Sequence, residues 1–125
     1  MDVRDAAETD ASDLADLLDT PVGVAERLLR ERAVTVAEQD RTVVGVVAYE
    51  VSDGAVHVTR LTGDPDAVSR LLDEPLAFAD AEDLPVKLFV TESEGDVRRA
   101  VETKGFQEVG AGPTLDGEPT KKYQY

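Results

Sequence analysis

One strand–helix–strand unit, residues 86–110, constrains the fold of this chain more than any other stretch. The alternating apolar residues Val86, Leu88 and Val90 predict a largely buried strand. Acidic and hydroxyl residues at 92–94 then predict a helix start, and apolar side chains follow at helical spacing. Gly105 is the expected end of this helix, because a left-handed backbone is needed there and glycine adopts it at little cost. The rest of the chain has to pack in layers on this unit.

The length of 125 residues suits a single domain spanning residues 1–125. The sequence contains no cysteine, which excludes disulfides, thiolate metal sites and a thiol nucleophile. It also shows no metal-ligand cluster and no dinucleotide fingerprint, so no metal is expected. The N-terminus is acidic, and no signal, transit or transmembrane pattern is present. We therefore expect a cytoplasmic protein with no membrane partner.

The charge is strongly one-sided, with 27 acidic and 13 basic residues and a formal net charge of −14. Phosphates would be repelled, so nucleic acid is not an expected partner. The composition resembles that of proteins from organisms that keep molar salt in their cytoplasm. At that salt concentration the screening length is about 3 Å, so repulsion among the acidic side chains is tolerated. An acidic surface that serves a basic partner is the alternative.

Helical patterns follow a short N-terminal strand. The strand is predicted at residues 2–6, and a helix capped by Thr9 or Asp10 comes next. A second helix is predicted to begin at Thr20 and Pro21, with the threonine as its cap and the proline in its first turn. We therefore expect two consecutive helices before the main sheet.

Three strands form a predicted meander at residues 33–38, 42–51 and 55–62. The middle strand is apolar on both faces, which places it inside the sheet, and its Gly45 predicts a bulge or the close approach of another backbone. Strict alternation along the third strand divides its side chains between two faces, with Val56 and Val58 on one, and His57, Thr59 and Leu61 on the other.

The C-terminal half alternates helices and strands. Asp64 and Pro65 are the predicted cap and first residue of a helix, which Pro75 is expected to kink or interrupt. The strand–helix–strand unit follows, and residues 120–125 form a last strand at the sheet edge. The predicted order is β-α-α-β-β-β-α-β-α-β-β, an α/β (α+β) fold.

This order, with three segments of sequence, resembles the GNAT superfamily of N-acetyltransferases. The segments are VRDAAETDASDLADLL, VAEQDRTVVGVVAYEV and DVRRAVETKGF. The resemblance implies a mixed, mostly antiparallel sheet flanked by helices. It also implies that acetyl-CoA, as co-substrate, lies in a V-shaped gap between the fourth and fifth strands. Its pantetheine would pair with the backbone of the fourth strand, and its pyrophosphate would sit on a Q/R-x-x-G-x-G/A loop at a helix N-terminus.

The sequence departs from that family pattern at the loop. The segment after the fourth strand reads TGDPDAV, in which Gly63 is the only glycine and Pro65 has no N–H to offer. Asp64 and Asp66 bring negative charge to the expected diphosphate position. The position of the family's proton-donating tyrosine falls on Val101, which cannot donate a proton.

The resemblance also assigns candidate site residues. Those that would bind the cofactor are five consecutive residues: Thr59, Arg60, Leu61, Thr62 and Gly63. Glu50, at the end of the third strand, and His57, the only histidine, are the candidate catalytic bases. The plainer interpretation makes Glu50 a solvated strand end and His57 a packed or surface residue.

Two functions follow from these observations. The first is a divergent N-acetyltransferase that moves acetyl from acetyl-CoA to an unidentified amine of a small molecule or a protein. The second is a non-catalytic module that lacks the pyrophosphate loop and keeps the fold for interaction or homodimerisation. A binder of another small molecule in the same gap is a third class.

Overall fold

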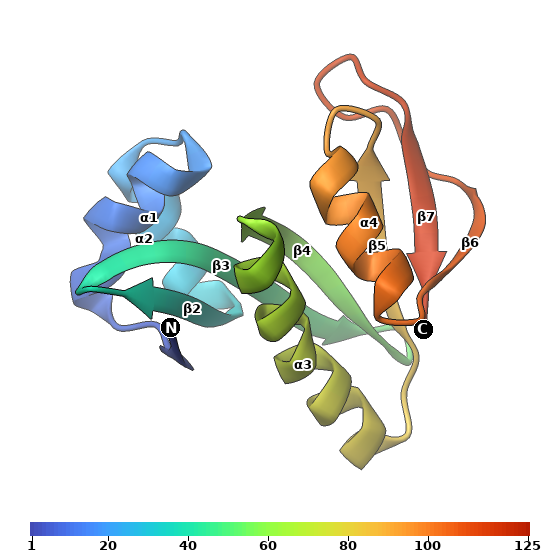
Figure 1. Ribbon diagram of the computed structural model, residues 1–125, viewed down its shortest axis with the longest axis horizontal. Helices are drawn as coiled ribbons and strands as arrows, with labels where there is room; N and C mark the ends of the chain where they lie inside the picture. The colour runs from blue at the N-terminus through green and yellow to red at the C-terminus, as the bar shows by residue number, and fades with distance from the viewer.

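Seven strands form one sheet in the computed structural model, which describes residues 1–125 (Figure 1). The strands are β1 (Asp2–Asp5), β2 (Ala33–Gln39), β3 (Thr42–Ser52), β4 (Ala55–Gly63), β5 (Val86–Thr91), β6 (Gln107–Ala111) and β7 (Thr120–Gln124). The helices are the short 3₁₀ helix η1 (Glu8–Asp10), α1 (Ala11–Leu18), α2 (Val22–Glu31), α3 (Pro65–Glu82) and α4 (Gly95–Thr103). Apart from η1, the predicted order of elements is confirmed.

The strands lie in the order β1-β2-β3-β4-β5-β7-β6. Only β4 and β5 pair in parallel, and all other neighbours pair antiparallel. The last strand, β7, lies between β5 and β6, although it follows both in sequence. The expected mixed, mostly antiparallel sheet is therefore confirmed, but β7 is an interior strand and the edge on that side is β6.

Two tight turns build the meander. Asp40 and Arg41, with φ of 52° and 66°, join β2 to β3, and Asp53 and Gly54, with φ of 51° and 71°, join β3 to β4. Positive φ at both central residues is typical of the type I′ hairpin, whose twist matches that of the flanking strands. The register of the meander follows from these local turns.

Helices cover both faces of the sheet. On one face α1 and α2 bury Leu14 and Ala25 against Val46 and other residues of β2 and β3. On the opposite face α3 and α4 bury a larger cluster that includes Val47, the next residue of β3. Neighbouring residues of a strand point to opposite faces, so β3 contributes to both cores and lies inside the sheet as predicted.

Two glycines allow α3 to lie close on the sheet. Gly45 in β3 pairs with Gly63 in β4. A Cβ on Gly45 would lie 3.0 Å from Leu71 Cδ1 and 3.1 Å from the Thr62 carbonyl oxygen. A Cβ on Gly63, where φ is +147°, would lie 3.1 Å from Gly45 Cα. The predicted close approach at Gly45 is confirmed, and it fixes the N-terminus of α3 beside the end of β4.

Two expectations about helices are wrong. The restart expected at Pro75 is absent, and its alternative, a kink, stays a prediction. α3 continues past this residue, because the proline is buried in the core-facing stripe and tertiary packing offsets one missing helix bond. Thr20 is not the cap of α2, whose N-cap is Pro21. The Thr20 amide instead donates to the Ala15 carbonyl at 2.9 Å and closes the left-handed end of α1, while its hydroxyl is buried without a partner.

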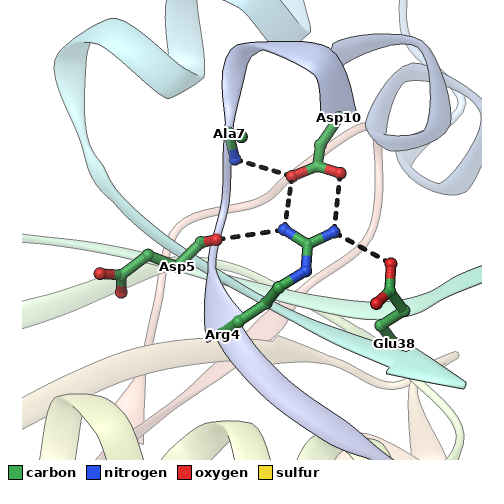
Figure 2. A network of polar contacts seen from close by, with 5 residues as sticks. All are labelled: Arg4, Asp5, Ala7, Asp10 and Glu38. Carbon is green, nitrogen blue, oxygen red and sulfur yellow. Dashed lines mark hydrogen bonds and ion pairs between the residues drawn. The ribbon is translucent and has the colours of Figure 1, made fainter. Parts of the chain in front are cut away.

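A polar network ties the N-terminal strand to the sheet and to η1 (Figure 2). The Arg4 guanidinium donates to both Asp10 carboxylate oxygens at 2.9 and 3.0 Å, and to Glu38 in β2 at 3.1 Å. Asp10 also accepts from the Ala7 amide at 2.7 Å. The hydrogen bond from Arg4 is the main cause that lowers the pKa of Asp10 below its ordinary value. This network holds the strand β1 and the entry to α1 in place.

Candidate functional site

The parallel pair β4 and β5 opens into a cleft. The two strands pair only at Val56 with Val86 and at His57 with Lys87. Beyond these pairs the strands separate and enclose a cavity of about 540 Å³. Figure 1 shows the two strands meeting at one end and diverging toward the other. The sheet therefore has a wedge-shaped opening in its middle.

A β-bulge at Thr59 shapes the β4 wall of this cleft. In the pairing with β3, Ala48 lies opposite Arg60 and Tyr49 lies opposite Val58, so Thr59 is the extra residue. The Thr59 hydroxyl donates to the Ala48 carbonyl at 3.3 Å. The predicted face of Leu61 is therefore wrong: the bulge reverses the alternation, and Leu61 joins Val56 and Val58 in the α3–α4 core.

The structure brings the five predicted cofactor-binding residues together. Thr59, Arg60, Leu61 and Thr62 line the cleft. Gly63 lines an adjoining hollow of about 410 Å³ at the wide end, which Leu61 and Thr62 share. Their placement follows from the path of β4 alone. Their roles toward acetyl-CoA stay predictions.

Two segments line the cleft that the sequence did not single out. One is the connection between α1 and α2, which contributes Leu18, Asp19 and Thr20. The other is the turn before β7, which contributes Leu115, Asp116 and Glu118. Asp19 and Asp116 have φ of 53° and 50° and mark sharp turns. The Asp-Gly pair at residues 116–117 was the one local signal of such a turn, and nothing in it indicates the cleft.

The N-terminus of α3 directly follows Gly63, which lines the adjoining hollow, and this helix start is closed to an anion. The Asp64 side chain accepts from the Ala67 amide at 2.8 Å and caps the helix, as predicted. Pro65 has no N–H, and the Val68 amide donates to the Asp64 carbonyl at 2.9 Å. Asp66 supplies the remaining first-turn amide together with a second carboxylate. This turn is not a cradle for a diphosphate.

The N-terminus of α4 faces the same opening and is also acidic. Glu94 is its N-cap residue, and its carboxylate accepts from the Thr91 hydroxyl at 2.7 Å and from the Thr91 amide at 3.3 Å. Asp96 follows in the first turn and lines the adjoining hollow. Both helix N-termini at the wide end therefore carry carboxylates.

The two predicted catalytic residues lie outside the cleft. Glu50 and His57 are cross-strand partners near the closed end of the wedge. Glu50 forms an ion pair with Arg32 at 3.4 Å, and the His57 ring lies 3.2 Å from the Ser52 carbonyl oxygen. Neither lines the 540 Å³ cavity. Their catalytic roles stay predictions that depend on a relay through water.

No tyrosine lines the cleft as a proton donor. Val101, at the position of the family's tyrosine, is fully buried in the α3–α4 core. Tyr123 is also buried, its hydroxyl donates to Glu102 at 3.4 Å, and burial raises its pKa. Tyr125 is exposed and lies against Phe106.

No set of three or more His, Asp and Glu side chains is arranged to hold a metal ion. None of the helices has the length and apolar character needed to span a membrane.

Comparison with known proteins gives the fold. No protein-family model and no curated protein sequence matches the chain. Among solved structures, an N-acetyltransferase from Staphylococcus aureus Mu50 is 11% identical with a TM-score of 0.82, over 99% of this chain and 96% of its own. A ribosomal-protein-alanine N-acetyltransferase from Brucella melitensis is 16% identical with a TM-score of 0.81, over 100% and 99%. A putative GNAT-family acetyltransferase from Desulfovibrio desulfuricans is 16% identical with a TM-score of 0.78, over 99% and 97%. The chain therefore has the fold of the GNAT acetyltransferases, as its sequence resemblance implied.

Proposed function

We propose that this chain is a divergent GNAT-type N-acetyltransferase, which transfers acetyl from acetyl-CoA to an amine. The observation that carries the proposal is the wedge between β4 and β5. The edge of β4 beyond His57 has no strand partner on this side, so its main-chain groups are free to pair with an extended ligand. The pantetheine arm of acetyl-CoA carries two amides and has that extended form.

The pantetheine fits this chain, and the diphosphate does not. The β4 edge offers main-chain donors and acceptors over residues 58–62. The usual anion site at the start of α3 instead presents Asp64, Pro65 and Asp66. We therefore assign affinity for acetyl-CoA to its acyl-pantetheine part, with no contribution from a diphosphate cradle.

The charge of the cleft favours a cationic acceptor. The only basic residue in its lining is Arg60. Four acidic residues line it: Asp19, Glu94, Asp116 and Glu118. Three of them come from the α1–α2 connection and the turn before β7. An ammonium group would be attracted there. It gives up one proton to solvent to become the attacking amine, and a nearby carboxylate can take the second nitrogen-bound proton as the new bond forms. In the transfer the nitrogen–carbon bond forms, the carbon–sulfur bond breaks, and the departing thiolate takes a proton from solvent.

A non-catalytic module is the second candidate function. Two observations favour it: the Asp64 carboxylate occupies the N-terminus of α3, and buried Val101 replaces a proton donor. This candidate predicts that the wedge binds no acyl-CoA.

Calorimetric titration in molar KCl separates the two candidates. Acetyl-CoA and acetylpantetheine are expected to bind with similar affinity, and 3′-phospho-ADP is expected not to bind. An affinity of acetyl-CoA at least 100-fold above that of acetylpantetheine would show that the diphosphate is held after all. No heat and no melting shift with millimolar acetyl-CoA would reject the enzyme and leave the module.

The predicted bases are tested by Glu50→Gln and His57→Gln once turnover is measured. A base role requires kcat to fall by about 100-fold or more, with loss of the acidic limb of the pH–rate profile. A smaller fall would move the search for the base to the carboxylates that line the cleft.

A further inference from the structure

A second, smaller hollow lies beside the cleft, between α2 and β4. Its volume is about 200 Å³, and three arginines line it: Arg27, Arg32 and Arg60. Leu18, Thr20 and Arg60 line both this hollow and the cleft, so the two cavities adjoin. A ligand in the cleft can therefore extend a group into the hollow.

Two buried polar atoms at this hollow have no hydrogen-bond partner. They are the Thr20 hydroxyl oxygen and the Arg32 Nε, and both residues line it. Arg32 Nε is a donor only, and a hydroxyl can also donate. Solvent does not reach either atom, so neither faces the open space of the hollow, and the arginines can donate there only through their other guanidinium nitrogens. An oxyanion accepts hydrogen bonds from guanidinium groups and donates none.

The charge of the hollow also favours an anion. Arg27 and Arg60 have no carboxylate within 4.0 Å, whereas Arg32 is paired with Glu50 at 3.4 Å. Glu31 is the one acidic residue in the lining. The hollow is therefore a basic site on a chain whose formal net charge is −14. The guanidinium fork matches a carboxylate in shape as well as in charge.

We propose that this hollow binds the carboxylate of the acceptor, so that the substrate is a small aminocarboxylate such as a free amino acid. Its ammonium group lies in the acidic part of the cleft near Asp19 and Asp116, and its carboxylate lies among the arginines. Arg60 lines both cavities and can hold the carboxylate where they adjoin. This inference rests on the proposed acetyltransferase function for the fate of the amine, but the binding of the carboxylate can be measured without it.

The test compares amino acids with their amides in the absence of acetyl-CoA. L-Alanine and L-alaninamide, and L-leucine and L-leucinamide, are titrated into the full chain at constant KCl and followed by NMR. Each acid is expected to bind at least about tenfold tighter than its amide. Arg27→Gln is expected to remove most of this difference. Arg30→Gln is the matched control, because Arg30 lies on the same helix and lines a different hollow.

The outcomes separate this inference from the proposed function. Acid-selective binding that depends on Arg27, with no turnover of any amine, would overturn the enzyme and support the carboxylate site. Equal affinity for acid and amide, equal effects of Arg27→Gln and Arg30→Gln, or no binding of either ligand would overturn the carboxylate site. A loss of acetyl-CoA affinity in Arg27→Gln would assign the arginines to the phosphates of CoA and overturn it as well.

Discussion

The two edges of β4 differ in how far they are paired. Toward β3 the strand has eight residue pairs, from Ser52 with Ala55 to Gly45 with Gly63. Toward β5 it has two, at Val56 and His57. The same strand is therefore held rigidly on one side and left open on the other. A binding site placed on such a strand obtains free main-chain groups without losing the support of the sheet.

The closed edge depends on close packing, and the open edge depends on charge and on turns. The β3 side is fixed by Gly45 and Gly63 under α3, where added atoms have no room. The open side is bordered by carboxylates from separate turns and by the acidic start of α4. Changes on the closed side should therefore alter stability, and changes on the open side should alter ligand affinity.

The largest expected effect comes from Gly63→Val, which places a side chain on the closed edge of β4. A Cβ there would lie 3.1 Å from Gly45 Cα and 3.2 Å from Ala67 Cβ, closer than ordinary van der Waals contact, and the residue would have to keep an unfavourable φ of +147°. We expect a loss of about 3 kcal/mol in the free energy of unfolding, measured by urea denaturation. Gly23→Ala, where no atom lies within 4 Å, is the control and should stabilise α2 by about 0.5–1 kcal/mol. Equal stability of the two variants would show that the glycine contact is not what holds this edge.

The second largest expected effect is a loss of stability when the network around Arg4 is broken. Asp10→Asn should lower the free energy of unfolding by about 2 kcal/mol and leave ligand affinity in the cleft unchanged. The folded-state pKa of Asp10 lies below its ordinary value of 3.8, so its contribution is complete above that pH. It is lost as the pH falls from 3.8 through the lowered folded-state pKa. Denaturation curves of both proteins from pH 7 to pH 2 should therefore converge in acid, and a constant gap would contradict the assignment.

A smaller effect is expected at the open edge, at the start of α3. Asp64→Asn keeps the cap and removes one negative charge, so acetyl-CoA should bind about two- to fivefold tighter at low salt. Wild-type affinity should rise with KCl, because salt screens the repulsion between the phosphates and the acidic cleft. Asp80→Asn, at the other end of α3, serves as the control. Calorimetry that finds affinity falling with salt would indicate a basic phosphate site instead.

The smallest effect concerns the bulge that joins the two edges. Thr59→Val removes the hydrogen bond to the Ala48 carbonyl and should cost about 0.5–1 kcal/mol of stability. Thr59→Ser restores the donor and should recover most of this loss. If serine and valine destabilise equally, the hydroxyl does not hold the bulge.

The sequence predicted what depends on local chemistry. The hairpins at Asp40–Arg41 and Asp53–Gly54, the Asp64 cap and the order of elements follow from turn residues and periodicity. The bulge at Thr59 could not be predicted in this way, because strict alternation is assumed until an extra residue is seen. The face of Leu61 was wrong for that reason alone.

The composition of the cleft was harder to predict than its position. Residues 59–62 line the cleft and Gly63 lines the adjoining hollow because this stretch is one continuous strand, and their binding of acetyl-CoA stays a prediction. Asp19, Asp116 and Glu118 reach it from turns distant in the sequence, and only tertiary structure brings them there. The prediction for Thr20 failed for a local reason. A Thr-Pro pair is a common helix start, but here the Thr20 amide donates to the Ala15 carbonyl at the end of α1.

The position of β7 has a consequence for how the molecule is assembled. β7 separates β5 from β6, so the wall of the cleft opposite β4 has no continuous ladder until residues 120–124 have been synthesised. The contacts of α1 and α2 with β2 and β3 involve only residues 11–48, which are synthesised much earlier. We therefore expect a nascent chain to pair β4 with β3 before the binding wedge is complete.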